Sequence, residues 1–465
     1  MRHNTITSCT ENPEEPSILT TVNIKMKKYY QLVLVIVSVV SFITLLFYRH
    51  EYNRLRYVME VLSFFGKPGQ VAECLPPNIS QNLKKSVSFI DPLPSWQRLT
   101  DTHFVYSAFW EKNDIHSHVK VFSVEAGKTI PQYSCEVWFE DNNTPVTGRF
   151  SYTIIQSKES ALTHEQTVIA DNVIAYNLYC KPKQIPGIPF GVTFFKTDSL
   201  LPSHVFIPVG YPVDRQILEN STAVCVVPGF KPVLQKSAII EFLSYHHLIG
   251  VNEFIVYDKG LPNRIAQVLL DPAIKENFGI ALSLLPWNFP FPHLEAEPVM
   301  RLVVERDCIQ RTAGKVRNVA VLGWGEYVVP RYHHTLAGML DDFDTKKKTT
   351  TSFEIPTIVF CTDLLEHDTD ESLPLVLRKT RYYKGDDMDP PLHLYRPQTA
   401  VSRFTVPSTQ RVSQGIAAVH RYIECMLGTG EQPVETLPYE RAILRFAGDL
   451  KRSKLLRAWS SGRLF

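Results

Sequence analysis

The spacing of apolar and polar residues sets one N-terminal segment apart from the rest of the chain. From Tyr29 to Tyr48 the sequence reads YYQLVLVIVSVVSFITLLFY, without a formal charge. A helix rises about 1.5 Å per residue, so a stretch of this length crosses a hydrocarbon core of roughly 30 Å. The pattern predicts a transmembrane signal anchor over 29–48 behind a tail over 1–28. A cleaved signal peptide is the alternative, but no small-residue cleavage site follows.

After the anchor, the pattern changes twice. Residues 49–95 mix charge with Gly-Lys-Pro-Gly and Leu-Pro-Pro, as expected of a stem. Residues 96–215 contain short runs rich in valine, phenylalanine and tyrosine, separated by polar turns, such as HFVYSAFW, CEVWFE and RFSYTII. Runs of this length and composition predict strands, so we expect a mainly β module there.

From residue 216 to residue 445, runs with strand character alternate with runs that carry apolar residues at helical spacing. AVCVVPGF, NEFIVYDKG, IALSLLPW and VRNVAVLGWG read as strands, and SAIIEFLSYHHLI and PVMRLVVERDCIQRTAG read as helices between them. This rhythm predicts an α/β domain with a mainly parallel sheet. Ligands of such sheets bind beyond the carboxyl ends of the strands. Residues 446–465 read as a basic C-terminal tail.

The segment VAVLGWGEYVVPR at 319–331 is the most informative of these strands. Its apolar run stops at Gly323 and resumes as EYVVP after a Gly-Trp-Gly turn. The strand-end rule places this turn, from Gly323 to Glu326, at the rim where a ligand is expected.

Cysteines and glycosylation sequons help to orient the predicted anchor, because three lysines before it and three arginines after it balance one another. Seven of the eight cysteines follow the anchor, together with three sequons. Both features favour an oxidising lumen and a single-pass type II membrane protein. An odd number of lumenal cysteines leaves at least one without an intrachain partner, and the pairing is not fixed by the sequence. The sequons begin at Asn78, Asn142 and Asn220.

The composition argues against one class of partner. The net charge is +2, with 44% apolar and 21% charged residues. These are ordinary globular values without a basic excess, so nucleic acid is not expected as a partner.

Four blocks in order make the chain resemble glycosyltransferase family 92, formerly a domain of unknown function. The similarity runs over roughly residues 100–445. It implies a GT-A-like nucleotide-sugar fold, Golgi or ER membrane location with a lumenal catalytic domain, and transfer of a hexose, most often galactose, from a UDP-sugar donor to an acceptor glycan. The blocks are FVYSAFW, AVCVVPGF with IIEFLSYHHLIGVNEFIVYD, ERDCIQRTAGKVRNVAVLGWGEYVVPR, and SRFTVPSTQRVSQGIAAVH.

The resemblance also implies a divalent cation, Mn²⁺ or Mg²⁺, held by two aspartates one residue apart and bridging the donor phosphates. Aligned through Glu326, these aspartates become Gly323 and Gly325. Glu326 remains, and His420 matches a late family histidine that commonly completes the metal shell. The cofactor is therefore in doubt from the sequence alone. Other Asp-x-Asp strings, starting at Asp342, Asp368 and Asp387, stand in polar loops without a strand before them.

Several residues are candidates for the site, each beside a structural alternative. Glu326 is the catalytic candidate and a doubtful metal ligand, or a satisfied polar residue at a strand end. Trp324 would stack on a sugar or uracil ring, or pack in the core. Asp258 would contact the nucleotide, or shape an Asp-Lys-Gly turn.

Basic and histidine residues complete the candidates. Arg403, where the family has lysine, and Arg331 would meet the charge of the leaving diphosphate, with Arg411 as a further candidate. Adjacent His246 and His247 do not face the same way on a helix, so they read as surface or packing residues. Two functions follow: an active hexosyltransferase, or a pseudoenzyme that keeps the fold as a glycan- or protein-binding module.

Overall fold

The fold is taken from a computed structural model, which describes sixteen segments of the chain. Contacts divide the chain into two units, Met1–Lys67 and Pro68–Phe465. The described residues are 37–41, 44, 94–112, 117–127, 132–155, 173–196, 205–211, 220–229, 236–261, 263–291, 294–344, 350–363, 373–383, 390–401, 408–425 and 437–464.

Little of the first unit is described. Residues 37–41 and 44 are helical, and the Thr44 hydroxyl donates to the Val40 carbonyl at 2.6 Å. Most of the anchor predicted over 29–48, together with the tail and the stem as far as residue 93, lies outside the described residues. Among the residues that are described, no helix combines the length and the apolar character needed to cross a membrane.

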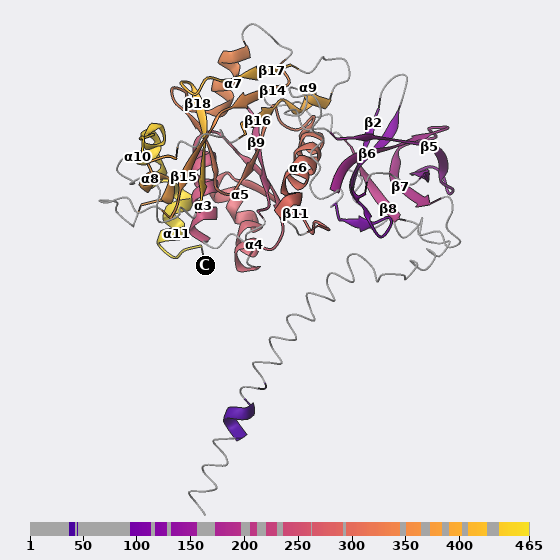
Figure 1. The fold of residues 1–465 in the computed structure, drawn as a ribbon, viewed down its shortest axis with the longest axis horizontal. Helices are drawn as coiled ribbons and strands as arrows, with labels where there is room; N and C mark the ends of the chain where they lie inside the picture. The colour runs from indigo at the N-terminus through magenta and orange to yellow at the C-terminus, as the bar shows by residue number, and fades with distance from the viewer. Residues whose placement is uncertain are drawn as a thin grey trace, which may run out of the picture. The chain divides into compact units, whose positions relative to one another are not determined.

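The second unit begins with a mainly β module, as predicted, and its eight-stranded sheet closes through pairing of β2 with β8 (Figure 1). Alternate residues point inward, and in β4 every second residue is buried. The Cys135–Cys180 disulfide lies inside this core. The strands are β1 Gln97–Arg98, β2 His103–Glu111, β3 His118–Ala126, β4 Tyr133–Phe139, β5 Val146–Ile154, β6 Val173–Pro182, β7 Pro189–Lys196 and β8 Val205–Gly210.

A seven-stranded sheet follows, in the order β11-β10-β9-β12-β16-β14-β17. Strands β9 to β12 are parallel, which confirms the α/β prediction, whereas β16 runs antiparallel to β12. Successive strands add on one side of β9 until β12 adds on the other, so the order reverses between β9 and β12. The strands are β9 Thr222–Val227, β10 Glu253–Asp258, β11 Ala281–Pro286, β12 Asn318–Gly323, β14 Ser352–Ile355, β16 Leu392–Tyr395 and β17 Thr409–Arg411.

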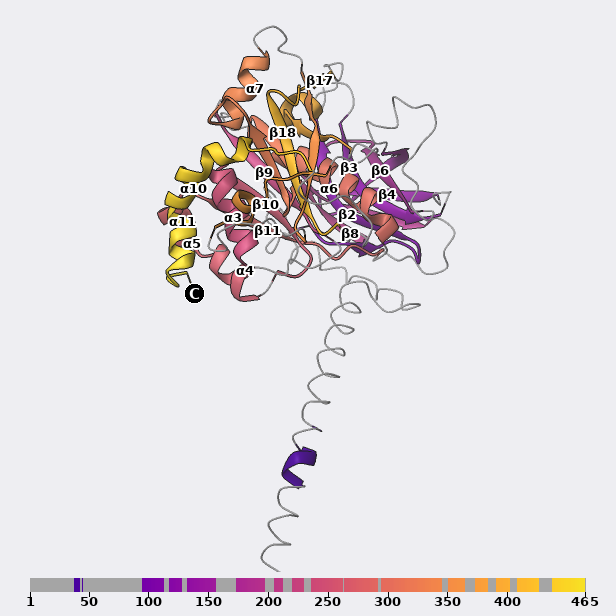
Figure 2. The same cartoon turned by 60° about the vertical axis from the view of Figure 1, so that its left-hand side comes forward.

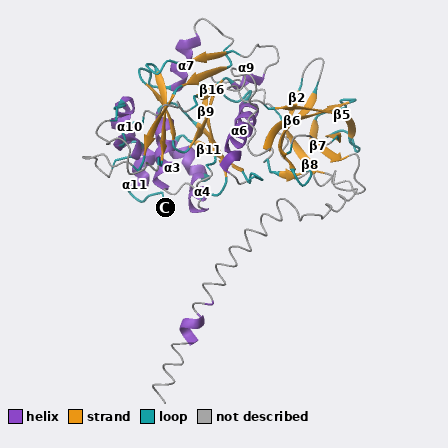
Figure 3. Cartoon of the chain, in the orientation of Figure 1, coloured by secondary structure: helices purple, strands orange, loops and turns teal. Residues whose placement is uncertain are grey.

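Helices connect and cover these strands (Figure 3). Asp271 caps α5 by accepting from the Ala273 amide at 2.9 Å, and Gly279 ends it in the left-handed region. The helices are α3 Lys236–Leu248, α4 Asn263–Leu269, α5 Pro272–Phe278, α6 Glu297–Thr312, α7 Leu336–Asp344, α8 Leu375–Arg378 and α9 Pro397–Val401, with a short 3-10 helix η2 at Leu294–Ala296.

A three-stranded sheet, β13-β18-β15, completes the fold, and its central strand β18 is labelled in Figure 2. The segment predicted as a basic tail instead forms helices that pack on α3, because Leu450 and Leu455 bury their side chains there. The elements are β13 Glu326–Pro330, β15 Thr357–Cys361, β18 Ala417–Ile423, η4 Ala442–Phe446, α10 Ala447–Arg452 and α11 Lys454–Ser460.

Helix α6 lies between the two larger sheets, contacting β9 and β12 on one side and β3 and β6 on the other. The Cys225–Cys308 disulfide joins it to β9. A third disulfide links Cys361 and Cys425. Cys74 lies outside the described residues.

Candidate functional site

The carboxyl ends of the parallel strands gather the predicted rim residues at one edge. Val227, the last residue of β9, pairs with Gly323, the last residue of β12. Asp258 ends β10 on the same edge. Because the strand order reverses between β9 and β12, this edge is where sheets of this type bind ligands.

The turn from Gly323 to Glu326 is built on a close backbone approach. The Gly325 carbonyl accepts from the Tyr422 amide at 2.8 Å. A Cβ atom at Gly325 would lie 2.6 Å from the Tyr422 carbonyl oxygen, closer than real Cβ contacts come. At Gly323 the nearest atoms to such a Cβ belong to Glu326, at 3.6 Å. Glycine at position 325 is therefore required by this backbone.

Trp324, between the two glycines, is partly buried and packs against the core. Its ring lies 5.2 Å from the ring of Phe242 on α3, edge to face. This contact corresponds to the packing alternative. Stacking on a sugar or base stays a prediction.

Glu326 is buried, with both carboxylate oxygens engaged by arginines. One oxygen accepts from Arg301 and Arg421, each at 3.1 Å. The other accepts from Arg301 at 2.8 Å and from the Gly323 amide at 2.7 Å. We call Arg301, Glu326 and Arg421 the arginine clamp.

Two opposing effects set the charge state of Glu326. Burial alone raises its pKa, but the charge and hydrogen bonds of Arg301, the charge of Arg421 and the Gly323 amide outweigh burial and hold the pKa below its ordinary value. An ionised carboxylate with a lowered pKa is a weak proton acceptor. The contacts thus favour Glu326 as an anchor for two arginines, while its catalytic and metal roles stay predictions.

His420 does not meet Glu326. In the β13–β18 pairing, Glu326 lies opposite Arg421, and Tyr327 lies opposite His420. Neighbouring residues of a strand point to opposite faces, so His420 and Glu326 lie on different faces of this sheet. The His420 ring is buried 4.7 Å from the Phe360 ring, and neither ring nitrogen has a hydrogen-bond partner. Burial, helped by the charge of Arg331, lowers the pKa of His420 to about 3.

The remaining candidates are engaged in local structure or lie outside the described residues. Asp258 accepts from the amides of Gly260 and Leu261 at 2.8 and 2.7 Å, as a turn residue does. Arg331 pairs with Glu440 and donates to the Gln414 carbonyl. Their contacts with a nucleotide stay predictions.

The structure describes two of the three remaining basic or histidine candidates. Arg403 lies outside the described residues. Arg411 pairs with Glu354 at 3.2 Å on the exposed part of β17. His246 is buried against Phe242, with ring centroids 4.2 Å apart, which fits the packing role expected for it.

The alternative acidic pairs offer no second metal site among the described residues. Asp342 pairs with His333 at 2.6 Å, and the pairs starting at Asp368 and Asp387 lie outside the description. In the part of the chain that is described, one group has metal-ligand spacing, Cys361 with Asp363 and Cys425, and its two cysteines form a disulfide. Of the predicted glycosylation sites, Asn220 is exposed, Asn142 is half-buried and Asn78 is not described.

Sequence reasoning missed Arg301 and Arg421. Arg301 comes from α6 and Arg421 from β18, 25 and 95 residues from Glu326 along the chain. Their only sequence signal is position: Arg301 lies in the helix before β12, and Arg421 follows His420.

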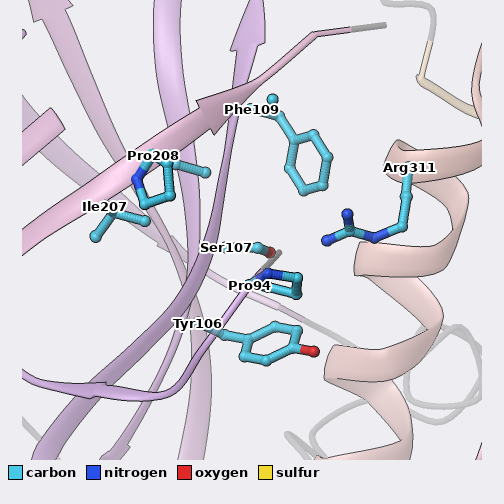
Figure 4. A pocket seen from close by; sticks show the side chains of 9 residues that line it. Pro94, Tyr106, Ser107, Phe109, Ile207, Pro208 and Arg311 are labelled. Carbon is cyan, nitrogen blue, oxygen red and sulfur yellow. The ribbon is translucent and has the colours of Figure 1, made fainter. Parts of the chain in front are cut away.

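A cavity of about 10 Å³ between β2, β8 and α6 is lined by Tyr106, Ser107 and Arg311 (Figure 4). Ligand sites for small molecules are usually some hundreds of Å³. This cavity is the size of one water molecule and does not compete with the sheet edge as a substrate site.

The sheet edge lies within a segment that matches a known protein family. Residues 220–382 match the model of glycosyltransferase family 92. This segment is a glycosyltransferase family 92 domain. The family 92 match begins beside β9 and includes the Gly-Trp-Gly turn, Arg301 and Glu326, whereas Arg421 and His420 follow it. No curated protein matches the chain.

Proposed function

We propose that the chain is a glycosyltransferase of the GT-A type that moves a hexose, galactose in the first instance, from a UDP-sugar to an acceptor glycan. One observation carries the proposal: the family 92 domain contains the point where the strand order reverses, between β9 and β12. In such sheets this point binds nucleotides. The acceptor hydroxyl would attack the anomeric carbon as UDP departs.

The test is release of UDP by the purified full-length chain in detergent. UDP-galactose, UDP-glucose and UDP-N-acetylglucosamine would be offered with a panel of glycan acceptors. Acceptor-dependent release from UDP-galactose, with a labelled product, is the expected result. Turnover of another UDP-sugar would correct the donor, and failure to bind or turn over any of them would overturn the proposal.

A pseudoenzyme that binds a glycan or a protein is the second candidate, because both oxygens of Glu326 are already engaged by Arg301 and Arg421. A site of this kind would bind a glycan from the acceptor panel without consuming any donor. Binding of acceptors together with absent donor binding would favour this candidate.

We further propose a single-pass type II protein of the Golgi or ER membrane, anchored by residues 29–48. Three disulfides among the described residues and the exposed sequon at Asn220 support a lumenal position of the domains. Retention in the membrane fraction after alkaline carbonate, and a mobility shift on deglycosylation that Asn220→Gln reduces, are expected. Release by carbonate would contradict the anchor.

A further inference from the structure

We infer that the Gly-Trp-Gly site holds no divalent cation and that the arginine clamp instead meets the negative charge of the donor diphosphate. The second half rests on the proposed UDP-sugar donor. The first half concerns this chain's own residues and stands apart from any activity.

The first step is steric. A metal-ligating side chain at position 325 needs a Cβ, and that atom would lie 2.6 Å from the Tyr422 carbonyl oxygen. The obstacle is backbone, held by the pairing of β13 with β18, and it cannot rotate away as a side chain can. No ligand can be placed at position 325 without moving β18.

The second step concerns the carboxylate that remains. Glu326 already accepts four hydrogen bonds, three from guanidinium groups and one from the Gly323 amide. A cation bound there would have to displace an arginine or lie against two positive charges. Like charges at such distances repel strongly in a partly buried site.

The third step concerns the remaining ligand. His420 lies on the opposite face of the β13–β18 pair from Glu326. The two side chains that the family resemblance assigns to the metal therefore cannot share one ion. A lone carboxylate between two arginines does not offer the several oxygen ligands that Mn²⁺ or Mg²⁺ requires.

The fourth step is the chemistry that the clamp does offer. The side chains of Arg301 and Arg421 are 27% and 18% exposed, so both are partly accessible at the rim. Beside Glu326, the charges of Glu305 and Glu297 also act on Arg301, which donates to the Val321 carbonyl at 3.0 Å as well. Guanidinium groups bind phosphate oxygens through paired hydrogen bonds, and Glu326 holds them in place for that contact.

The decisive experiment separates metal from nucleotide. Titration of Mn²⁺ into the purified full-length chain, followed by the paramagnetic resonance signal of free Mn²⁺, is expected to show no stoichiometric binding. Isothermal titration with UDP is expected to give the same affinity in EDTA and in Mn²⁺. Stoichiometric Mn²⁺ binding lost in Glu326→Gln, or UDP binding that requires Mn²⁺, would overturn the inference.

Variants test the arginines. Arg421→Gln is expected to weaken UDP binding roughly tenfold or more, with partial recovery in Arg421→Lys. Arg452→Gln removes an arginine of an exposed ion pair on α10, with Asp449 at 2.6 Å, and is expected to leave UDP affinity unchanged. Equal UDP affinity in Arg421→Gln and the parent chain, with thermal unfolding showing both folded, would overturn the role of the clamp.

The outcomes also distinguish this inference from the proposed function. Absence of UDP binding in every condition would sink the donor proposal and with it the role of the clamp, but the Mn²⁺ titration would still decide the metal question. UDP binding that needs Mn²⁺ would keep the donor proposal and overturn the inference alone.

Discussion

Helix α6 carries two buried charge clusters, and their differences separate a structural role from a binding role. Near its carboxyl end, Asp307 is fully buried and pairs with Arg311, whose side chain is 5% exposed. Asp307 also accepts from Ser107 of β2 and Tyr257 of β10. Near its amino end, Arg301 reaches Glu326 in the arginine clamp, where both arginines remain partly exposed.

The two ion pairs on α6 have different roles because one is closed to solvent and the other is partly open to it. The Asp307 cluster ties the closed sheet to α6 and the parallel sheet, because its members come from β2, α6 and β10. The cavity beside it, at about 10 Å³, is too small for a substrate. The arginine clamp lies at the carboxyl edge of the sheet, and its two arginine side chains are 27% and 18% exposed.

The largest effect is expected from breaking the inner cluster. Asp307→Ala removes the carboxylate that pairs with buried Arg311, which should cost about 4 kcal/mol of the free energy of unfolding. Urea denaturation followed by circular dichroism measures this cost. Asp449→Ala, in an exposed pair with Arg452, is the control and should change stability by less than about 1 kcal/mol. Equal effects in both variants would remove the contrast.

A smaller loss is expected in the clamp. Glu326→Gln should destabilise by about 2 kcal/mol at neutral pH, because the partly exposed arginines can turn to water. The sign with pH follows from the lowered pKa of Glu326. Its contribution is present above the unfolded glutamate value of about 4.3 and is lost as the pH falls through the folded value. Parent and variant should therefore converge in acid, and a constant difference would contradict this explanation.

Gly325→Ala tests the backbone contact beside the clamp. The added Cβ must push β13 and β18 apart, which should cost about 2 kcal/mol. Gly323→Ala meets only ordinary contacts and should have a smaller effect in the same thermal unfolding assay. If Gly325→Ala unfolds like the parent chain, the steric requirement at this position is wrong.

The smallest expected effect concerns the face of β18 that points away from the arginine clamp. His420 is buried and neutral, with a pKa of about 3 against about 6.5 when unfolded, so its contribution is present above about 6.5 and lost as the pH falls. At pH 5.5 the loss is about 1 kcal/mol. His420→Phe should reduce the slope of stability against pH between pH 7 and 5.5, and leave the part due to His246, whose pKa burial also lowers to about 3. An unchanged slope would exclude His420 as its source.

Local patterns predicted much of the fold. The alternation of apolar runs at 222–323 predicted the parallel strands, and the run ending at Gly323 predicted the rim, because strand ends and glycine turns are local properties of a chain. The helices over 447–460 were missed, because the prediction followed the basic residues of this segment, whereas the surface of α3 that buries Leu450 and Leu455 exists only in the assembled fold.

The sequence placed Glu326 at the rim of the sheet but did not reveal which residues contact it. Glu326 could be placed at the rim from its strand, but its partners come from β18 and α6, and only the assembled register brings Arg421 opposite it. Likewise, side chains alternate between the two faces of β18, so His420 lies away from Glu326. An alignment of single positions does not show this separation.

The missing Cβ at Gly325 also bears on how this chain could change by mutation. Converting Gly323 and Gly325 to aspartates would put one side chain beside Glu326 and the other into the Tyr422 carbonyl. A paired-aspartate motif at these two positions would therefore need a shift of β18 away from the turn before the second aspartate could be accommodated.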